Sequence, residues 1–283
     1  MVVLIISLIV LSVIFIFQNK LVESTSRLRW TRWIFLTYTL GFIGWYAQGQ
    51  LSVVNIFPII ESFKNGFDIN TYLLDPITFI LWIYVFISLF LWGRGLFCGW
   101  LCPFGALQEM ISWLAKKLKI KQWKISDRHH RQLWSIKYLI LIGLVGLSFF
   151  STKQAMSFSE VEPFKTAITE TFVRHWPFVI YAIFLLGMGL FVHKFYCRYL
   201  CPLGAGLAIL GWFHRFEWLS RRKECGNPCS FCSSNKVCEI RAIEKSGEVN
   251  YNECIQCLDC VAVLKADDRC PVRMLEVKKL KIN

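Results

Sequence analysis

The sequence predicts two parts: an all-α membrane domain of about five helices with a parallel internal repeat, then a small α+β domain. Three observations predict this. First, 55% of the 283 residues are hydrophobic and only 18% are charged, whereas soluble domains have about 45–50% apolar and about 25% charged residues. Second, a ten-residue motif occurs twice. Third, the composition becomes polar and rich in cysteine after residue 222.

Apolar segments define the membrane domain, since a helix needs about 17–25 apolar residues to cross the hydrocarbon core. The first segment has no basic start and no small-residue cleavage site, so we interpret it as a helix and not as a signal peptide. The candidate spans cover residues 2–18, 33–57, 77–97, 133–150 and 178–196.

Lys and Arg alternate between the connecting loops. Residues 19–32, residues 116–131 and the tail after residue 196 are basic, whereas the loops 57–76 and 151–177 are not. Because basic loops stay in the cytoplasm, we expect a multi-pass protein of the cell inner membrane with its C-terminus in the cytoplasm. We attribute the net charge of +13 to orientation and lipid contact and not to nucleic acid.

The repeated motif reads FCGWLCPFGA at residues 97–106 and YCRYLCPLGA at residues 196–205. Each copy ends an apolar segment, so both are expected at cytoplasmic helix ends. The spacing puts both sulfurs of a copy on one helical face, and the Pro and Gly that follow mark a break in the helix. The four thiols either bind one metal, act as redox dithiols or pack as reduced cysteines: Cys98, Cys102, Cys197 and Cys201.

Residues 223–283 form the predicted second domain, and the membrane domain is residues 1–222. A segment of about 60 residues makes a poor core and usually needs a metal or disulfides. Its eight cysteines fit two [4Fe–4S] clusters, which take four thiolates each. Zinc favours paired C-x2-C knuckles and disulfides are disfavoured in the cytoplasm. We therefore expect a cytoplasmic ferredoxin-like domain with two clusters.

The cluster ligands are assigned across the two cysteine triplets, because the distant cysteine of a two-cluster ferredoxin serves the other cluster. The first set is Cys225, Cys229, Cys232 and Cys270, and the second set is Cys254, Cys257, Cys260 and Cys238. The first triplet departs from the bacterial spacing, and Glu239 replaces the usual Pro after Cys238. Clusters saturated by protein ligands suit electron transfer, and no catalytic residue pair stands beside them.

The histidines are expected to be solvated or interfacial, and the acidic residues of the loop 151–177 are expected to be solvated. His193 is the best placed of the five histidines for a quinone headgroup, and Glu162 is expected in a solvated outer loop.

Together these motifs resemble the C-terminal half of the NosR/NirI type of membrane iron–sulfur (polyferredoxin) proteins. The resemblance is carried by residues 97–109, 162–168, 195–205 and 223–229. A looser resemblance extends to NapH-type quinol dehydrogenase subunits and to the CcoG type. It implies an electron path for nitrous oxide respiration (denitrification), from quinol or a ferredoxin-type donor toward a periplasmic flavin domain and a copper reductase. It also implies a part in expression and maturation of that reductase.

The family's flavin domain would precede the first helix, in which this sequence starts at Met1. We therefore expect the flavin on a partner chain or subunit, or else a changed function. The leading hypothesis is a membrane electron-transfer protein, and an oxidoreductase subunit of the quinol-dehydrogenase type is left open. The alternatives are a redox-sensing or copper-maturation factor for a respiratory reductase, and an assembly scaffold whose clusters are structural.

Overall fold

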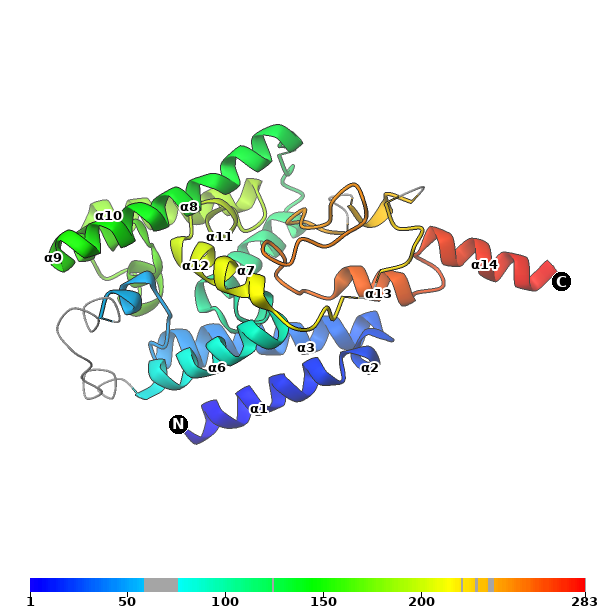
Figure 1. Ribbon diagram of the computed structural model, residues 1–283, viewed down its shortest axis with the longest axis horizontal. Helices are drawn as coiled ribbons and strands as arrows, with labels where there is room; N and C mark the ends of the chain where they lie inside the picture. Colours follow the sequence, from blue (N-terminus) through cyan, green and yellow to red (C-terminus); the bar gives the residue numbers. More distant parts are fainter. Residues whose placement is uncertain (59–75, 124, 220, 227–228, 234–236, 283) are drawn as a thin grey trace.

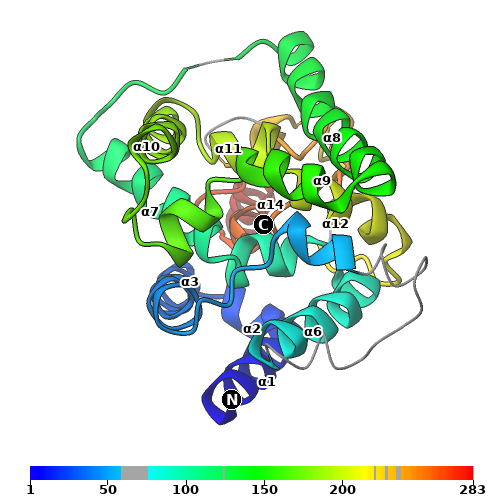
Figure 2. The ribbon, with the colours of Figure 1, turned by 90° about the vertical axis from the view of Figure 1, so that its left-hand side faces the viewer.

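The computed structural model describes the whole chain except residues 59–75, 124, 220, 227–228, 234–236 and 283. Its long helices run broadly along the long axis of the molecule, and the cysteine-rich tail lies at one end of them (Figure 1). Seen along that axis, the helices surround the middle of the molecule, with the tail behind them (Figure 2). The predicted outer loop 57–76 falls almost entirely outside the described residues.

The N-terminal helices are α1 (Val2–Ile16), α2 (Gln18–Val22) and α3 (Thr25–Tyr38), and α3 continues as the π-helix η1 (Thr39–Tyr46). Ser24 starts α3 because its side chain accepts the backbone N–H of Arg27, a usual N-cap bond. The short 3₁₀-helix η2 (Val53–Ile56) follows.

The two copies of the repeat have the same order of elements. In the first copy, α6 (Pro76–Trp92) leads through the π-helix η3 (Phe97–Leu101) to α7 (Pro103–Lys117). In the second, α10 (Trp176–Phe191) leads through α11 (Phe195–Tyr199) to α12 (Pro202–Leu210). Helix α7 packs on α10, so the copies interlock.

Between the copies, α8 (Asp127–Phe150) packs on α12 and α9. It is the one helix among the described residues that is both long and apolar enough to cross a membrane. Three of the other four predicted spans are helices shorter than expected, since α1, α6 and α10 have 15, 17 and 16 residues. The predicted span 33–57 is helical through α3 and η1 only as far as Tyr46. The remaining elements here are α9 (Thr152–Phe158), η4 (Ser159–Val161), η5 (Lys165–Thr169) and η6 (Gly211–Phe213).

The prediction of an α+β tail is wrong in its β part. The described tail contains η7 (Phe231–Ser233), α13 (Asp259–Lys265) and α14 (Pro271–Ile282), with two isolated β-bridges and no named strand. Residues with positive φ such as Arg241 and Gln256 turn the backbone repeatedly, and the long tract between Cys238 and Cys254 pairs only through the single bridge Ile243–Val249. The cysteines still lie in the interior, because most of them join the same buried core as the helices.

Candidate metal centre

In both repeat copies, the second cysteine starts the next helix. Cys102 has an extended backbone (φ −81°, ψ 114°) and its Sγ accepts the N–H of Gly105 at 3.3 Å. Cys201 does the same before α12, with its Sγ 3.2 Å from the N of Gly204. The helix break predicted at Cys-Pro is confirmed in both copies. Each sulfur thus lies at a helix N-terminus, which favours negative charge.

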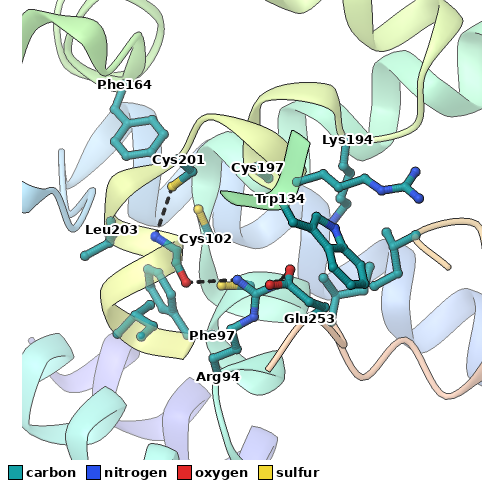
Figure 3. Close-up of a pocket in the computed structure, with 16 residues that line it drawn as sticks. Arg94, Phe97, Cys102, Trp134, Phe164, Lys194, Cys197, Cys201, Leu203 and Glu253 are labelled. Carbon is teal, nitrogen blue, oxygen red and sulfur yellow. Dashed lines mark hydrogen bonds and ion pairs between the residues drawn. The ribbon is translucent and has the colours of Figure 1, made fainter. Parts of the chain in front are cut away.

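The four repeat cysteines line one cavity of about 30 Å³. Cys102 and Cys201 are buried, while Cys98 and Cys197 are partly exposed. Figure 3 shows Cys102, Cys197 and Cys201 beside this space, which Arg94, Lys194 and Trp134 also line. Gln50 also approaches, with its Nε2 3.8 Å from the Sγ of Cys102. The predicted convergence of two motifs on one place is therefore present in the fold.

The electrostatics of this cavity suit a group that carries negative charge. Burial raises the pKa of Cys102 to about 11, with nearby Cys98 adding to the shift, and burial also raises the pKa of Cys201 well above its usual value. Buried cations, Arg94, Lys194 and Arg198, line the same cavity as these neutral thiols. Within the described chain, the Nε atoms of Arg94 and Arg198 and the Nε1 of Trp134 have no hydrogen-bond partner.

In the cavity, N–H donors without partners thus lie beside thiols that carry no charge. A bound metal would balance this charge, because metal ligation deprotonates thiols and the resulting thiolates would face the unpaired donors. The donor set therefore fits a thiolate-ligated centre. In the described parts of the chain, however, no three His, Cys, Asp or Glu side chains are close enough to hold a single metal ion. The four sulfurs line a space and do not meet at one point.

In the tail, burial and neighbouring thiols raise the pKa of Cys232 of the first assigned set and of several cysteines of the second. Burial raises the pKa of Cys232, and Cys225 and Cys270 are among the groups that raise it further. Burial likewise raises the pKa of Cys254 to about 12, and Cys238 acts in the same direction. The Cys260 thiol lies near Cys254 and Cys238, and also near Cys232 of the first set, so the division of the ligands between two clusters stays a prediction.

The second set is the more enclosed one. Cys238, Cys254 and Cys260 are buried and Cys257 is partly exposed. The Sγ of Cys254 accepts the N–H of Gln256 at 3.3 Å, and that of Cys238 accepts the N–H of Ala242 at 3.2 Å. Such N–H···S bonds help to set the reduction potential of an iron–sulfur cluster.

Charged residues that sequence reasoning did not single out join the tail to the cavity. Glu253 precedes Cys254, and its carboxylate is 3.1 Å from Arg94 Nη2 and forms an ion pair with Lys137. Tyr138 donates its hydroxyl to the same carboxylate at 3.0 Å. Lys137 was detectable in the sequence as a cation inside the apolar segment 133–150, since such residues usually have a function and a partner.

Two histidines and one glutamate are buried, contrary to the prediction. His130 contacts the Tyr199 hydroxyl at 2.8 Å and Arg198 Nη2 at 3.0 Å. His193 lies 3.1 Å from a carboxylate oxygen of Glu239. Each has a polar partner, which allows burial. His129 and His175 are exposed, as expected.

Glu162 is only 3% exposed, because the segment that follows α9 folds back against η2. Its carboxylate accepts the Ser52 hydroxyl and the N–H of Val53. The sequence predicted a solvated Glu162. In the structure these two hydrogen bonds take the place of hydrogen bonds to water.

The comparisons with known proteins cover both parts of the chain. Residues 223–281 match the NosR family, and residues 74–121 and 174–223 match the family described as 4Fe-4S binding domain. The two latter ranges contain the two copies of the repeated cysteine motif. No solved structure matches the chain.

Curated relatives agree with the family matches. The regulatory protein NosR of Stutzerimonas stutzeri is 49% identical over 277 residues, which is 98% of this chain and 38% of that protein. Protein NirI of Paracoccus denitrificans is 46% identical over 94% of this chain and 39% of its own length. The putative electron transport protein YccM of Escherichia coli is 31% identical over 68% of this chain and 53% of its own.

Fold and cysteine sets thus define a helical iron–sulfur protein. The chain belongs to the NosR/NirI family, and it spans about two-fifths of the length of the NosR and NirI relatives named above.

Proposed function

We propose that this chain is a membrane-bound iron–sulfur protein that carries electrons between two [4Fe–4S] clusters in its tail and a metal centre at the four repeat cysteines. The observation that carries the proposal is an ion pair that links the cysteine-rich tail directly to the cavity of the repeat cysteines. Glu253, next to the cluster ligand Cys254, is bound to Arg94, which lines the cavity of the repeat cysteines.

The ligand sets support two tail clusters. The first set is Cys225, Cys229, Cys232 and Cys270, and the second is Cys238, Cys254, Cys257 and Cys260. Bound clusters would supply one-electron storage. The protein's own part is to hold the sulfurs, to exclude water by burial and to set the potential through N–H···S bonds and nearby cations. Arg221 is one such cation, near both Cys232 and Cys260.

Membrane attachment is supported by α8 and by the apolar outer faces of the shorter helices. On α1, for example, Ile5, Ile9 and Val13 are 42%, 58% and 47% exposed, which suits lipid contact and not water. With the predicted orientation, the tail faces the cytoplasm. The expected donor is quinol or a ferredoxin-type protein, and the expected acceptor is a flavin-binding periplasmic domain or subunit in nitrous oxide respiration.

The first experiment is anaerobic purification of the full chain, followed by iron and sulfide analysis and electron paramagnetic resonance (EPR). Added menaquinol should give signals of reduced [4Fe–4S] centres if the chain accepts electrons from quinol. Signals that appear only with dithionite would mean that another donor or a flavin subunit is required. Clusters that no quinol, flavin or ferredoxin partner reduces or oxidises would refute electron transfer.

A second candidate function is redox sensing or copper maturation. It is favoured by the cavity, because buried thiols beside cations also suit a soft metal such as Cu(I), and the S. stutzeri relative is named a regulatory protein. This reading predicts copper bound to Cys98, Cys102, Cys197 and Cys201, and little electron flux. Metal analysis of the purified chain with and without a Cys98→Ser/Cys102→Ser substitution would separate the two.

A further inference from the structure

The two copies of the repeat differ at two positions that face the tail. The first copy has Gly95 and Gly99, and the second has Lys194 and Arg198 in the same register relative to its cysteines. In each copy the two positions are four residues apart, but Lys194 precedes α11 with a left-handed backbone (φ 51°), and Arg198 lies inside that helix. Glycine in a helix lowers stability by about 0.5–1 kcal/mol relative to alanine, so two glycines here need a reason.

The reason is close approach of the tail backbone. A Cβ atom on Gly99 would lie 1.9 Å from the carbonyl oxygen of Ile255. A Cβ atom on Gly95 would lie 2.5 Å from Cγ of Gln256 and 2.9 Å from the carbonyl oxygen of Cys254. We call the surface formed by Gly95 and Gly99 the glycine groove. Any side chain in the groove would push residues 254–256 away from the first cysteine motif.

Polar contacts fix the segment in the glycine groove. Trp100, inside the first motif, donates its Nε1–H to the carbonyl of Gln256 at 3.0 Å. The Gln256 amide donates in turn to the carbonyl of Trp92. Glu253 is held at the other end of the segment by Arg94.

The second copy reaches the tail through Arg198. Arg198 Nη1 donates to the carbonyl of Glu239 at 3.3 Å, and Glu239 follows Cys238. Lys194 pairs instead with Glu109 of α7, 3.0 Å away, which ties the second copy to the first. The tail residues held by the two copies are therefore neighbours in sequence of Cys254 and Cys238, both of the second set.

We infer that the glycine groove is the docking site of residues 253–256, and that it makes the second set the tail cluster that exchanges electrons with the repeat cysteines. This inference rests on the proposed function. The second-set cysteines would hold a cluster that stores one electron, and the four repeat cysteines would hold the centre that exchanges this electron with it, so that no bond need form or break. The first set, Cys225, Cys229, Cys232 and Cys270, is then the outer relay that receives electrons from or gives them to a soluble partner.

The test compares Gly99→Ala with the matched control Gly143→Ala in the anaerobically purified full chain. A Cβ at Gly143 of α8 meets nothing within 4 Å. Two readouts are used: hydrogen–deuterium exchange of residues 253–258, and the magnetic interaction between tail clusters and the repeat-cysteine centre in EPR spectra of the stepwise reduced protein. Cys257→Ser and Cys225→Ser variants identify which tail cluster takes part.

We expect Gly99→Ala to keep the iron content of both tail clusters, to exchange faster at residues 253–258 and to lose the magnetic interaction, while Gly143→Ala behaves as the unchanged protein. Cys257→Ser should abolish the interaction and Cys225→Ser should preserve it. Unchanged exchange and unchanged interaction in Gly99→Ala would overturn the inference, and so would loss of the interaction in Cys225→Ser but not in Cys257→Ser.

A milder variant covers the case in which Gly99→Ala assembles no clusters. Trp100→Phe removes the indole N–H that reaches Gln256, together with part of the buried ring, and it should still speed exchange at residues 253–258. Unchanged exchange would overturn the docking contact. If the unchanged protein holds no redox-active centre at its repeat cysteines, the proposed function and the relay order both fail. The exchange measurement then still decides whether the glycine groove holds the tail.

Discussion

Lys137 and Glu253 form a buried ion pair that joins the middle of α8 to the residue before Cys254. The Lys137 side chain is fully buried and that of Glu253 is 4% exposed. The pair is shared with Arg94, so two cations face one carboxylate. Helix α8, the repeat cysteines and the second cysteine set are thereby linked through one side chain.

Replacing Glu253 by Ala should strongly destabilise the protein. The change leaves Arg94 and Lys137 buried without their carboxylate, and breaking a buried pair typically costs about 3–5 kcal/mol. Thermal unfolding of the detergent-solubilised protein measures the effect. The control is Glu276→Ala, which removes the more exposed partner of Arg222 and should cost about 0–1 kcal/mol. Equal losses of stability in the two variants would show that the buried ion pair stabilises the fold no more than the exposed one.

The assignment of Cys238 to the second set predicts a selective loss. In Cys238→Ser, the cluster of Cys254, Cys257 and Cys260 should lose its normal EPR signal while that of the first set remains. Iron content should fall by up to one cluster. Loss of the first-set signal alone would show that the ligands do not cross between the two triplets.

The paired substitution Cys98→Ser/Cys102→Ser should spare both tail clusters and abolish the centre at the repeat cysteines. The cavity keeps its shape, because serine also caps helices, but it loses two of four soft ligands. Metal content and reductive titration check this result. Electron transfer that continues unchanged in the variant would leave the repeat cysteines with a packing role only.

Glu162 predicts a loss of stability as the pH rises. Burial raises the pKa of Glu162 to about 7, although the Ser52 hydroxyl and the Val53 N–H work against the shift. A carboxyl with a raised folded-state pKa stabilises the fold fully below its unfolded pKa near 4.5, and this contribution disappears as the pH rises through about 7. Unfolding temperature should therefore fall between pH 5 and pH 8.

The Glu162→Gln variant should flatten that part of the pH profile, since the amide does not titrate. Glu160 is the matched control. It pairs with Arg174, whose hydrogen bond lowers the pKa of Glu160, so Glu160→Gln should leave the fall between pH 5 and pH 8 in place. If the unfolding temperature of Glu162→Gln fell between pH 5 and pH 8 as steeply as that of the unchanged protein, Glu162 would not be the group that titrates there.

Local features of the site were predictable from the sequence. The motif Cys-Pro-x-Gly carries its own helix start, because proline is favoured at the first helical position and the cysteine sulfur lies beside the amide of the glycine. The structure accordingly starts α7 at Pro103 and α12 at Pro202. Repetition of the motif also predicted that two copies meet, and they line one cavity.

Long-range features were not predictable in the same way. Glu253 and Lys137 are 116 residues apart, and nothing in the local pattern of either one names the other. Burial of His130 and Glu162 depends on partners supplied by distant segments, Tyr199 and Ser52. The α+β expectation for the tail failed because it relied on the usual ferredoxin pattern, whereas cysteine spacing and positive-φ residues shape this tail without a ladder.

The two cysteines of each motif differ in their structural role. Cys102 and Cys201 begin a helix as well as offering a sulfur, while Cys98 and Cys197 start none. An alanine at either helix-starting position removes a cap and a ligand together, so its effects on assembly and on redox chemistry are confounded. A serine there separates them, because it restores the cap and withholds the metal. A screen that scores only alanine variants would rank the second cysteine of each motif above the first for reasons unrelated to electron transfer.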